Sequence, residues 1–156
     1  MGLIDKPETQ FYAAQALGCS PVVQAILENS DIIKPVKPKT IAKSLAIGNP
    51  ADGYYATDAI RETKGWAAAV TDEEIVEAMK LLGQTEGIFT ETAGGVTLAA
   101  AKKLIEQKRI PRDEPIVICI TGHGLKTQEA VLDHIGKPLK IRPTLDSFEE
   151  AMRGKS

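Results

Sequence analysis

The chain has 156 residues, of which 43% are hydrophobic, and its formal net charge at neutral pH is −2. This length predicts a single domain with enough apolar residues for a packed core. The balanced charge, with no basic patch, argues against nucleic acid or an anionic membrane as the principal partner.

The amino-terminal sequence gives no sign of export or membrane insertion. Residues 1–10 contain no basic segment followed by an apolar run, and no stretch approaches the length of a transmembrane helix. Cys19 and Cys119 lie in apolar surroundings without the spacing of a metal site, so we expect two buried, reduced thiols. These features predict a cytoplasmic protein with no metal centre.

The first half of the chain alternates short apolar segments with helical patterns. Residues 10–16 predict a buried strand, and Ser20 followed by Pro21 predicts a helix over 20–29. Residues 34–39, with two prolines and three lysines, predict an irregular surface linker. An apolar segment at 40–47 then leads to a second helix, whose expected apolar positions include Tyr54, Tyr55, Ala59 and Ile60.

The second half repeats this alternation. Residues 66–70 predict a strand, and Thr71 with Glu74 predicts a capping box for a helix that ends near Leu82, with Gly83 as its C-cap. Another helix is expected to run from the Glu91–Gly95 turn to about residue 108. Residues 116–120 (IVICI) predict a strand that is buried on both faces.

This order predicts an α/β fold with a mostly parallel sheet and helices on both faces. Ligands of such sheets bind beyond the carboxyl ends of the strands. Thr121 follows the last predicted strand and precedes Gly122 and Gly124, which permit positive φ and close backbone approach. We therefore expect Thr121 to face a cofactor, with a simple hydroxyl-capped glycine turn as the alternative.

Three motifs occur together in this order: IGNP at 47–50, FTETAGG at 89–95 and TGHGLK at 121–126. With FYAAQALGCSPVV from residue 11, they resemble the carboxyl-terminal part of threonine synthase, a pyridoxal-phosphate (PLP) enzyme of the tryptophan-synthase β-like fold, fold type II. The resemblance implies that residues 1–126 are part of the large catalytic domain of such an enzyme. Residues 127–156 would then be a carboxyl-terminal extension.

The resemblance also implies roles for individual residues. Thr121 matches the hydroxyl that faces the pyridine nitrogen, Glu91 lies beside the ring, and Gly122 borders the pocket. Gly48 and Asn49 match a segment that packs against one face of the ring. Each residue also has an ordinary structural interpretation: Glu91 would complement a helix dipole, and Asn49 would be an N-cap before Pro50.

The Schiff-base lysine of the family lies in a Ser-x-Lys helix start, ahead of the matched region, as does the phosphate-binding loop. Lys43-Ser44 has the reverse order, and Lys126 lies beyond the last strand. We therefore assign no catalytic residue and expect the chain to need an amino-terminal half, to be inactive alone and to self-associate through uncovered apolar surface. The complete enzyme would convert O-phospho-L-homoserine and water into L-threonine and phosphate.

Two other hypotheses remain open. Threonine dehydratase and cysteine-synthase-like enzymes share the turn at Glu91 and the final strand. Alternatively, the chain is a non-catalytic nucleotide- or partner-binding α/β module that uses Gly122-His123-Gly124. Against this last hypothesis, no G-x-G-x-x-G motif follows the first strand.

Overall fold

The computed structural model describes residues 8–153. The strands are β1 (Ala13–Ala16) and β2 (Ala67–Val70), which pair in parallel with Ala13 opposite Ala67 and Ala16 opposite Val70. The helices are α1 (Pro21–Leu27), α2 (Gly53–Glu62), α3 (Asp72–Glu86), α4 (Thr92–Glu106) and α5 (Leu145–Arg153). Short 3₁₀ turns are η1 (Lys43–Leu45), η2 (Gly124–Lys126), η3 (Gln128–Ala130) and η4 (Leu132–His134).

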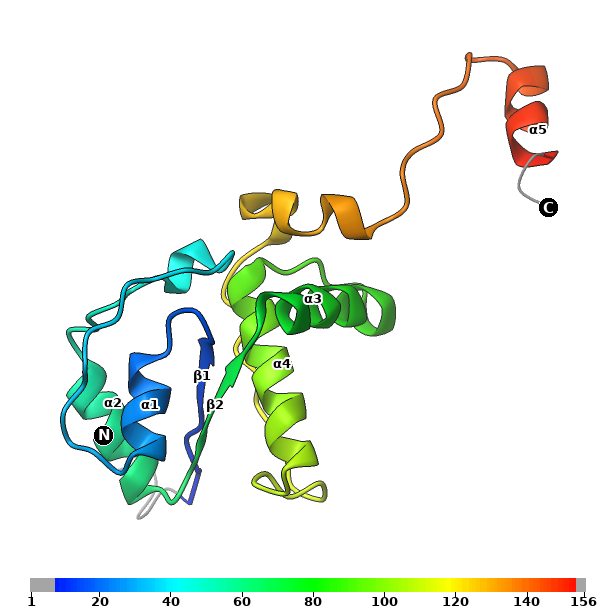
Figure 1. Cartoon of the computed structure of the whole chain (residues 1–156). Coiled ribbons are helices and arrows are strands. Elements are labelled where there is room, and N and C mark those ends of the chain that lie inside the picture. The colour runs from blue at the N-terminus through cyan, green and yellow to red at the C-terminus, as the bar shows by residue number, and fades with distance from the viewer. Residues whose placement is uncertain (1–7, 154–156) are drawn as a thin grey trace, which may run out of the picture.

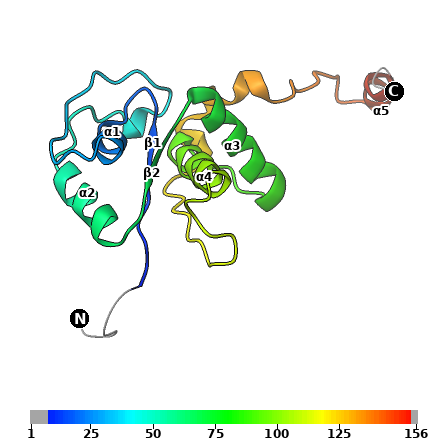
Figure 2. The ribbon, with the colours of Figure 1, turned by 60° about the horizontal axis from the view of Figure 1, so that its bottom comes forward.

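The sheet lies between two layers of helices. α1 and α2 cover one side of β1 and β2, and α3 and α4 lie on the other side (Figures 1 and 2). The larger core cluster includes Val70, Ile75, Val96 and Leu104, whereas the smaller one joins Val23, Ile26 and Ile60 beneath α1 and α2. The predicted α/β fold with helices on both faces is confirmed.

The first helix begins as predicted, but a different side chain caps it. Ser20 occupies the N-cap position without capping, and its hydroxyl donates to the carbonyl of Leu17 at 3.3 Å. Instead, Oε1 of Gln15 in β1 accepts from the amides of Val22 and Val23, both at 3.0 Å. The strand therefore supplies the acceptor that satisfies the first turn of α1.

The capping box of α3 is confirmed. The Thr71 hydroxyl accepts from the Glu74 amide at 3.2 Å, and the Glu74 carboxylate accepts from the Thr71 amide at 2.7 Å. Burial raises the pKa of Glu74, but hydrogen bonds from Lys103 and from the Thr71 amide outweigh it, so the pKa lies below its usual value. Because the pKa is lower in the folded state than in the unfolded state, ionised Glu74 stabilises the fold. This contribution is fully present above the unfolded-state pKa and is lost as the pH falls through the folded-state pKa.

The end of α3 was predicted four residues too early. The helix continues through Gly83 and closes at Gly87, whose φ of 68° is the left-handed conformation of a helix C-cap. Gly83 tolerates helical geometry, so its presence alone does not terminate the helix. The turn needs positive φ, and Gly87 supplies it without steric cost.

The predicted apolar face of α2 is also partly wrong. Tyr54 and Tyr55 are exposed, whereas Gly53, Thr57 and Ile60 are buried. The Thr57 hydroxyl donates to the Tyr54 carbonyl at 2.7 Å, which removes the cost of burying it. Residues 40–47 contain the turn η1 and no strand.

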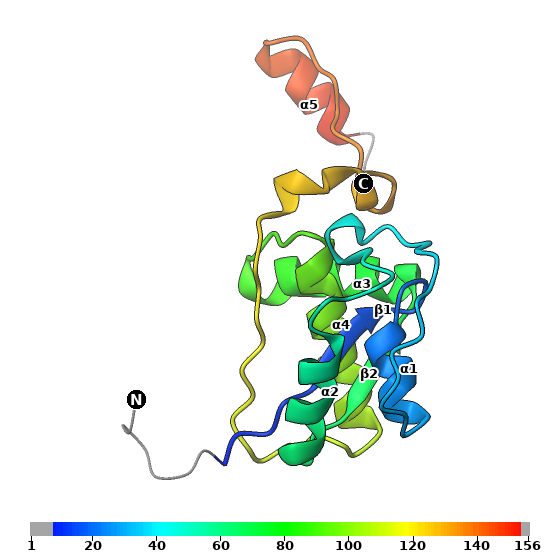
Figure 3. The ribbon, with the colours of Figure 1, turned by 90° about the vertical axis from the view of Figure 1, so that its left-hand side faces the viewer.

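The most consequential correction concerns residues 116–120. They are extended but unpaired within the described range, Val117 is 89% exposed, and Cys119 is exposed while Cys19 is buried. Figure 3 shows this yellow segment running along the outside of the body toward η2. The sheet within residues 8–153 consists of β1 and β2 alone, and neither pairs with this segment. The predicted buried strand therefore does not form there.

The carboxyl-terminal region leaves the body after η4. Val131 is buried in the core cluster, but α5 lies at the end of an extended segment, away from the other helices (Figure 1). None of the helices between residues 8 and 153 is long and apolar enough to cross a membrane.

Two isoleucines provide a matched test of this packing. Ile75 has no exposed surface, so Ile75→Ala should lower the free energy of unfolding by about 2–5 kcal/mol. Ile118→Ala, at a half-buried position in the unpaired segment, should cost no more than about 1 kcal/mol. Urea denaturation of both variants at equal concentration measures the difference, and equal losses would contradict the unpaired, half-buried position of Ile118.

Candidate functional site

The candidate site lies where α4 begins, at the carboxyl end of the strands. The segment 122–127 crosses this helix start and is held by backbone hydrogen bonds. The Glu91 amide donates to the Gly122 carbonyl at 3.0 Å, and the Gly124 amide donates to the Phe89 carbonyl at 2.9 Å. The Thr92 amide donates to the Thr127 hydroxyl at 3.1 Å, so a side chain of the crossing segment satisfies the first residue of α4.

The two glycines of the TGHG motif are needed for space. A Cβ atom on Gly122 would overlap the Glu91 carboxylate, and one on Gly124 would overlap the Phe89 ring. Neither glycine has positive φ, which corrects that part of the sequence interpretation. The His123 ring packs edge-on against Phe89 with ring centroids 5.6 Å apart, and its Nδ1 accepts from the Leu125 amide at 3.2 Å.

Glu91 is the central charged group of the site and is only 3% exposed. Its Oε1 lies 3.5 Å from the Thr121 hydroxyl, at the limit of a hydrogen bond. Its Oε2 lies 3.0 Å from Nζ of the exposed Lys126, yet this oxygen has no partner with hydrogen-bond geometry within the described residues. The ion pair offsets the charge of the buried carboxylate while leaving an acceptor site open.

A second buried polar atom lies beside it. The Thr92 hydroxyl oxygen is buried and has no hydrogen-bond partner in the described part of the chain. Such atoms are uncommon in native proteins and call for an explanation, because an unpaired buried hydroxyl costs free energy. Glu91, Thr92 and Thr121 thus form a polar group with unused hydrogen-bonding capacity.

The structure brings together three of the five predicted cofactor-binding residues: Thr121, Gly122 and Glu91. Gly48 lies elsewhere, against the 34–39 linker, where its carbonyl accepts from the Val36 amide at 2.9 Å. Asn49 beside it is exposed. Within residues 8–153, no hydrogen bond or ion pair joins Gly48 or Asn49 to Glu91.

The sequence interpretation missed Thr92 and Thr127 and set Lys126 aside. All three lie in or beside recognised motifs: Thr92 lies within ETAGG, Lys126 ends TGHGLK, and Thr127 directly follows it. The sequence shows that these side chains are polar, but only the fold shows that the two segments contact each other.

Comparison with known proteins decides the family. The family described as pyridoxal-phosphate dependent enzyme matches residues 2–122. The chain belongs to this family. The nucleotide-binding alternative loses its support, since pyridoxal phosphate is the cofactor of the family.

The most similar curated relatives include several threonine synthases. The protein of Methanocaldococcus jannaschii is 43% identical over 153 residues, covering 97% of this chain and 38% of that protein. The Methanosarcina acetivorans protein is 41% identical over 143 residues, covering 91% of this chain and 35% of that protein. The chain therefore spans just over a third of the length of these relatives.

Solved structures agree on the fold. Maize serine racemase superimposes with a TM-score of 0.56 at 18% identity, covering 94% of this chain and 39% of that one. Serine racemase from Dictyostelium discoideum gives a TM-score of 0.56 at 24% identity, covering 73% of this chain and 34% of that one. These likenesses assign the chain to the fold of the type II PLP enzymes.

The residues at the start of α4 fit one edge of this cofactor. Its pyridine nitrogen needs a hydrogen-bonding partner, and the exposed Thr121 hydroxyl has only one long contact, to Glu91. Glu91 Oε2, which is ion-paired with Lys126, and Thr92 Oγ1 are buried polar atoms without a hydrogen bond in the described part of the chain.

The close contact at Gly122 can be tested with two glycines. Gly122→Ala must displace the Glu91 carboxylate and should lower stability by about 1–3 kcal/mol. Gly136→Ala is the control, because a Cβ there has no heavy atom within 4 Å and should change stability by less than about 0.5 kcal/mol. Thermal and urea unfolding report both values, and a neutral Gly122→Ala would contradict the tight crossing of segment 122–127.

Proposed function

We propose that this chain forms the carboxyl-terminal part of a threonine synthase, whose complete form converts O-phospho-L-homoserine and water into L-threonine and phosphate. The observation that carries the proposal is the 43% identity to a threonine synthase across 97% of the chain. The contact between Thr121 and Glu91, two residues of separate family motifs, supports a shared site.

Pyridoxal phosphate, when bound, would supply the electron sink that stabilises negative charge developing along the substrate's carbon chain, which allows phosphate to leave and water to be added. In the proposal, the Thr121 hydroxyl would donate a hydrogen bond to the pyridine nitrogen. The 3.5 Å contact with Glu91 Oε1 is weak enough to be exchanged for this bond. A neutral hydroxyl partner leaves the nitrogen largely unprotonated, in contrast to a carboxylate.

Glu91 has a positioning role in this proposal. Its carboxylate lies under Gly122 and is fixed by Lys126 on one oxygen, so it limits where the Thr121 side chain and the ring edge can lie. Because the group is buried, its charge acts at short range with little screening by water.

Gly48 and Asn49 are proposed to pack against a face of the ring. The support is indirect: the preceding turn η1 packs on α4, and Lys43 in η1 forms a 3.2 Å ion pair with Glu129. These contacts hold the loop that contains Gly48 and Asn49 on the side of the molecule where segment 127–131 lies.

The remaining components of the site are proposed to come from the part of the enzyme that this chain does not match. The family's cofactor lysine and phosphate loop have no counterpart in the recognised motifs. Residues 116–120 would pair with a strand from that part, which explains an uncharged β-forming segment without a partner. Residues 1–126 would form the catalytic portion and residues 127–156 the extension.

Reconstitution tests the proposal. The chain is mixed with the separately produced amino-terminal part of the Methanocaldococcus jannaschii enzyme, pyridoxal phosphate and O-phospho-L-homoserine. We expect equimolar phosphate and L-threonine from the mixture and neither product from this chain alone. Release of phosphate with a 2-oxo acid in place of threonine, or no turnover in a mixture that binds the cofactor, would contradict the proposal.

The role of Thr121 can be tested in the same reconstituted enzyme. Thr121→Val removes the hydroxyl at nearly constant volume and should cost about 1–3 kcal/mol of transition-state stabilisation, measured as a fall in kcat/KM. Thr121→Ser keeps the hydroxyl and serves as the control. A Val variant with the activity of the parent at saturating cofactor would make Thr121 a turn residue only.

A further inference from the structure

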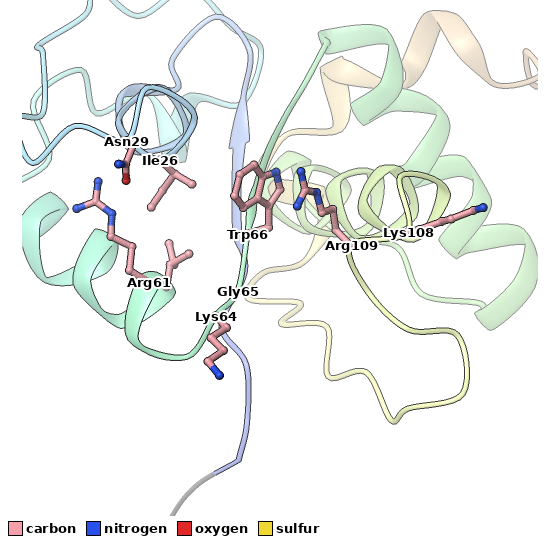
Figure 4. A pocket seen from close by; sticks show the side chains of 9 residues that line it. Ile26, Asn29, Arg61, Lys64, Gly65, Trp66, Lys108 and Arg109 are labelled. Atoms are coloured by element: carbon pink, nitrogen blue, oxygen red, sulfur yellow. The ribbon is translucent and has the colours of Figure 1, made fainter.

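A cavity lies far from Glu91, at the amino end of the strands. It encloses about 450 Å³. Its lining comes from the ends of three helices and the start of β2 (Figure 4): Ile26, Asn29, Ile60, Arg61, Lys64, Gly65, Trp66, Lys108 and Arg109. α4 begins at the candidate cofactor site and ends at this cavity, so its 15 residues separate the two by roughly 22 Å.

The three helices that end here do so in the same unusual way. Asn29, Lys64 and Lys108, with φ of 49°, 58° and 58°, are all the non-glycine residues with positive φ between residues 8 and 153. Each follows its helix in a Schellman motif. The next residue closes the motif in each case: the amides of Ser30, Gly65 and Arg109 donate to the carbonyls of Ala25, Ile60 and Leu104.

Glycine is the residue that adopts this conformation without strain, and α3, which ends away from the cavity, uses Gly87. The three helix ends at the cavity instead keep a polar or charged side chain despite the steric cost. Asparagine is an ordinary alternative to glycine at this position, but lysine is not. The two lysines therefore indicate a use for their side chains other than ending the helix.

The positive charge around the cavity is larger than the negative charge of the three helix carboxyl ends. Four of its nine lining residues are cationic, namely Arg61, Lys64, Lys108 and Arg109, and none is acidic. The three helix carboxyl ends carry about half a negative charge each. Asp31, which pairs with Arg61 at 2.6 Å, adds one more, so positive charge remains in surplus.

Two groups form a rigid part of the wall. Arg61 donates from Nη1 to Asp31 and from Nη2 to the Ser30 carbonyl at 2.7 Å, while its Nε is buried without a partner in the described chain. The Arg109 guanidinium stacks on Trp66 at 3.9 Å from the ring centroid. Lys64 and Lys108 are exposed, and their side chains point away from the cavity (Figure 4), so they would rotate to contact a ligand there.

We propose that this cavity binds the phosphate group of a small phosphate monoester. Guanidinium and ammonium donors suit phosphate oxygens, and a dianion matches the surplus charge better than a single carboxylate. The volume exceeds that of phosphate alone and falls in the range of small-molecule sites, while Trp66, Ile26 and Ile60 offer apolar contact to the organic part. The site is independent of the proposed threonine synthase activity.

Trp66 is the only tryptophan of the chain, so its fluorescence and its indole N–H resonance report on this cavity. The full chain is titrated with inorganic phosphate, phenyl phosphate and, at matched ionic strength, sodium chloride and benzoate. We expect saturable shifts with both phosphates at dissociation constants of about 1 mM or lower. Tighter binding of phenyl phosphate identifies an ester site, and equal shifts with chloride or benzoate, or none with phosphate, overturn the proposal.

A double variant separates binding from helix capping. Lys64→Gly with Lys108→Gly relieves the left-handed strain, so its Tm should equal or exceed that of the parent, while its phosphate affinity should fall about tenfold. Lys37→Gly with Lys140→Gly removes the same charge from exposed positions outside the cavity and should leave the affinity unchanged. Unchanged affinity in the first variant, or an equal loss in the second, overturns the proposal.

Discussion

The hydrogen bonds between residues 89–92 and residues 122–127 hold the last part of the chain on the body. No strand of the described range 8–153 lies beside residues 116–120, so the crossing at α4 fixes the direction of the segment that precedes it. The crossing depends on the absence of side chains at Gly122 and Gly124. It also buries Glu91, and the position of that carboxylate determines the polar surroundings of Thr121.

Local sequence signals predicted the structure well where a few neighbouring residues determine it. The capping box at Thr71 and Glu74, the strand that precedes it and the helix that begins at Pro21 all form as expected. Predictions failed where two local solutions compete. Gly83 and Gly87 both qualify as the end of α3, and burial does not choose between them, because residues 83–86 are exposed. Gly87 alone takes the left-handed conformation that closes the helix. The sequence of α2 likewise does not reveal which side of the helix meets α1.

The sequence placed Thr121, Gly122 and Glu91 in two motifs, and the structure brings the three residues together at one helix start, without strand pairing at residues 116–120. Their binding of the cofactor stays a prediction. Gly48 and Asn49 were recognised by the same resemblance, but their place relative to the ring depends on contacts that residues 8–153 do not contain. The left-handed conformation of Asn29 is one that asparagine adopts more readily than most residues, whereas nothing in the side chains of Lys64 and Lys108 predicts it.

The unpaired segment IVICI has a consequence for handling the protein at high concentration. A short, uncharged, β-branched stretch with free backbone donors and acceptors is a template for cross-β stacking between copies. The flanking sequence opposes this, because Pro111, Arg112, Asp113, Glu114 and Pro115 precede the segment directly and act as gatekeepers. In-register stacking would also align the exposed Cys119 thiols of neighbouring copies, so that air oxidation would turn a reversible association into a covalent one.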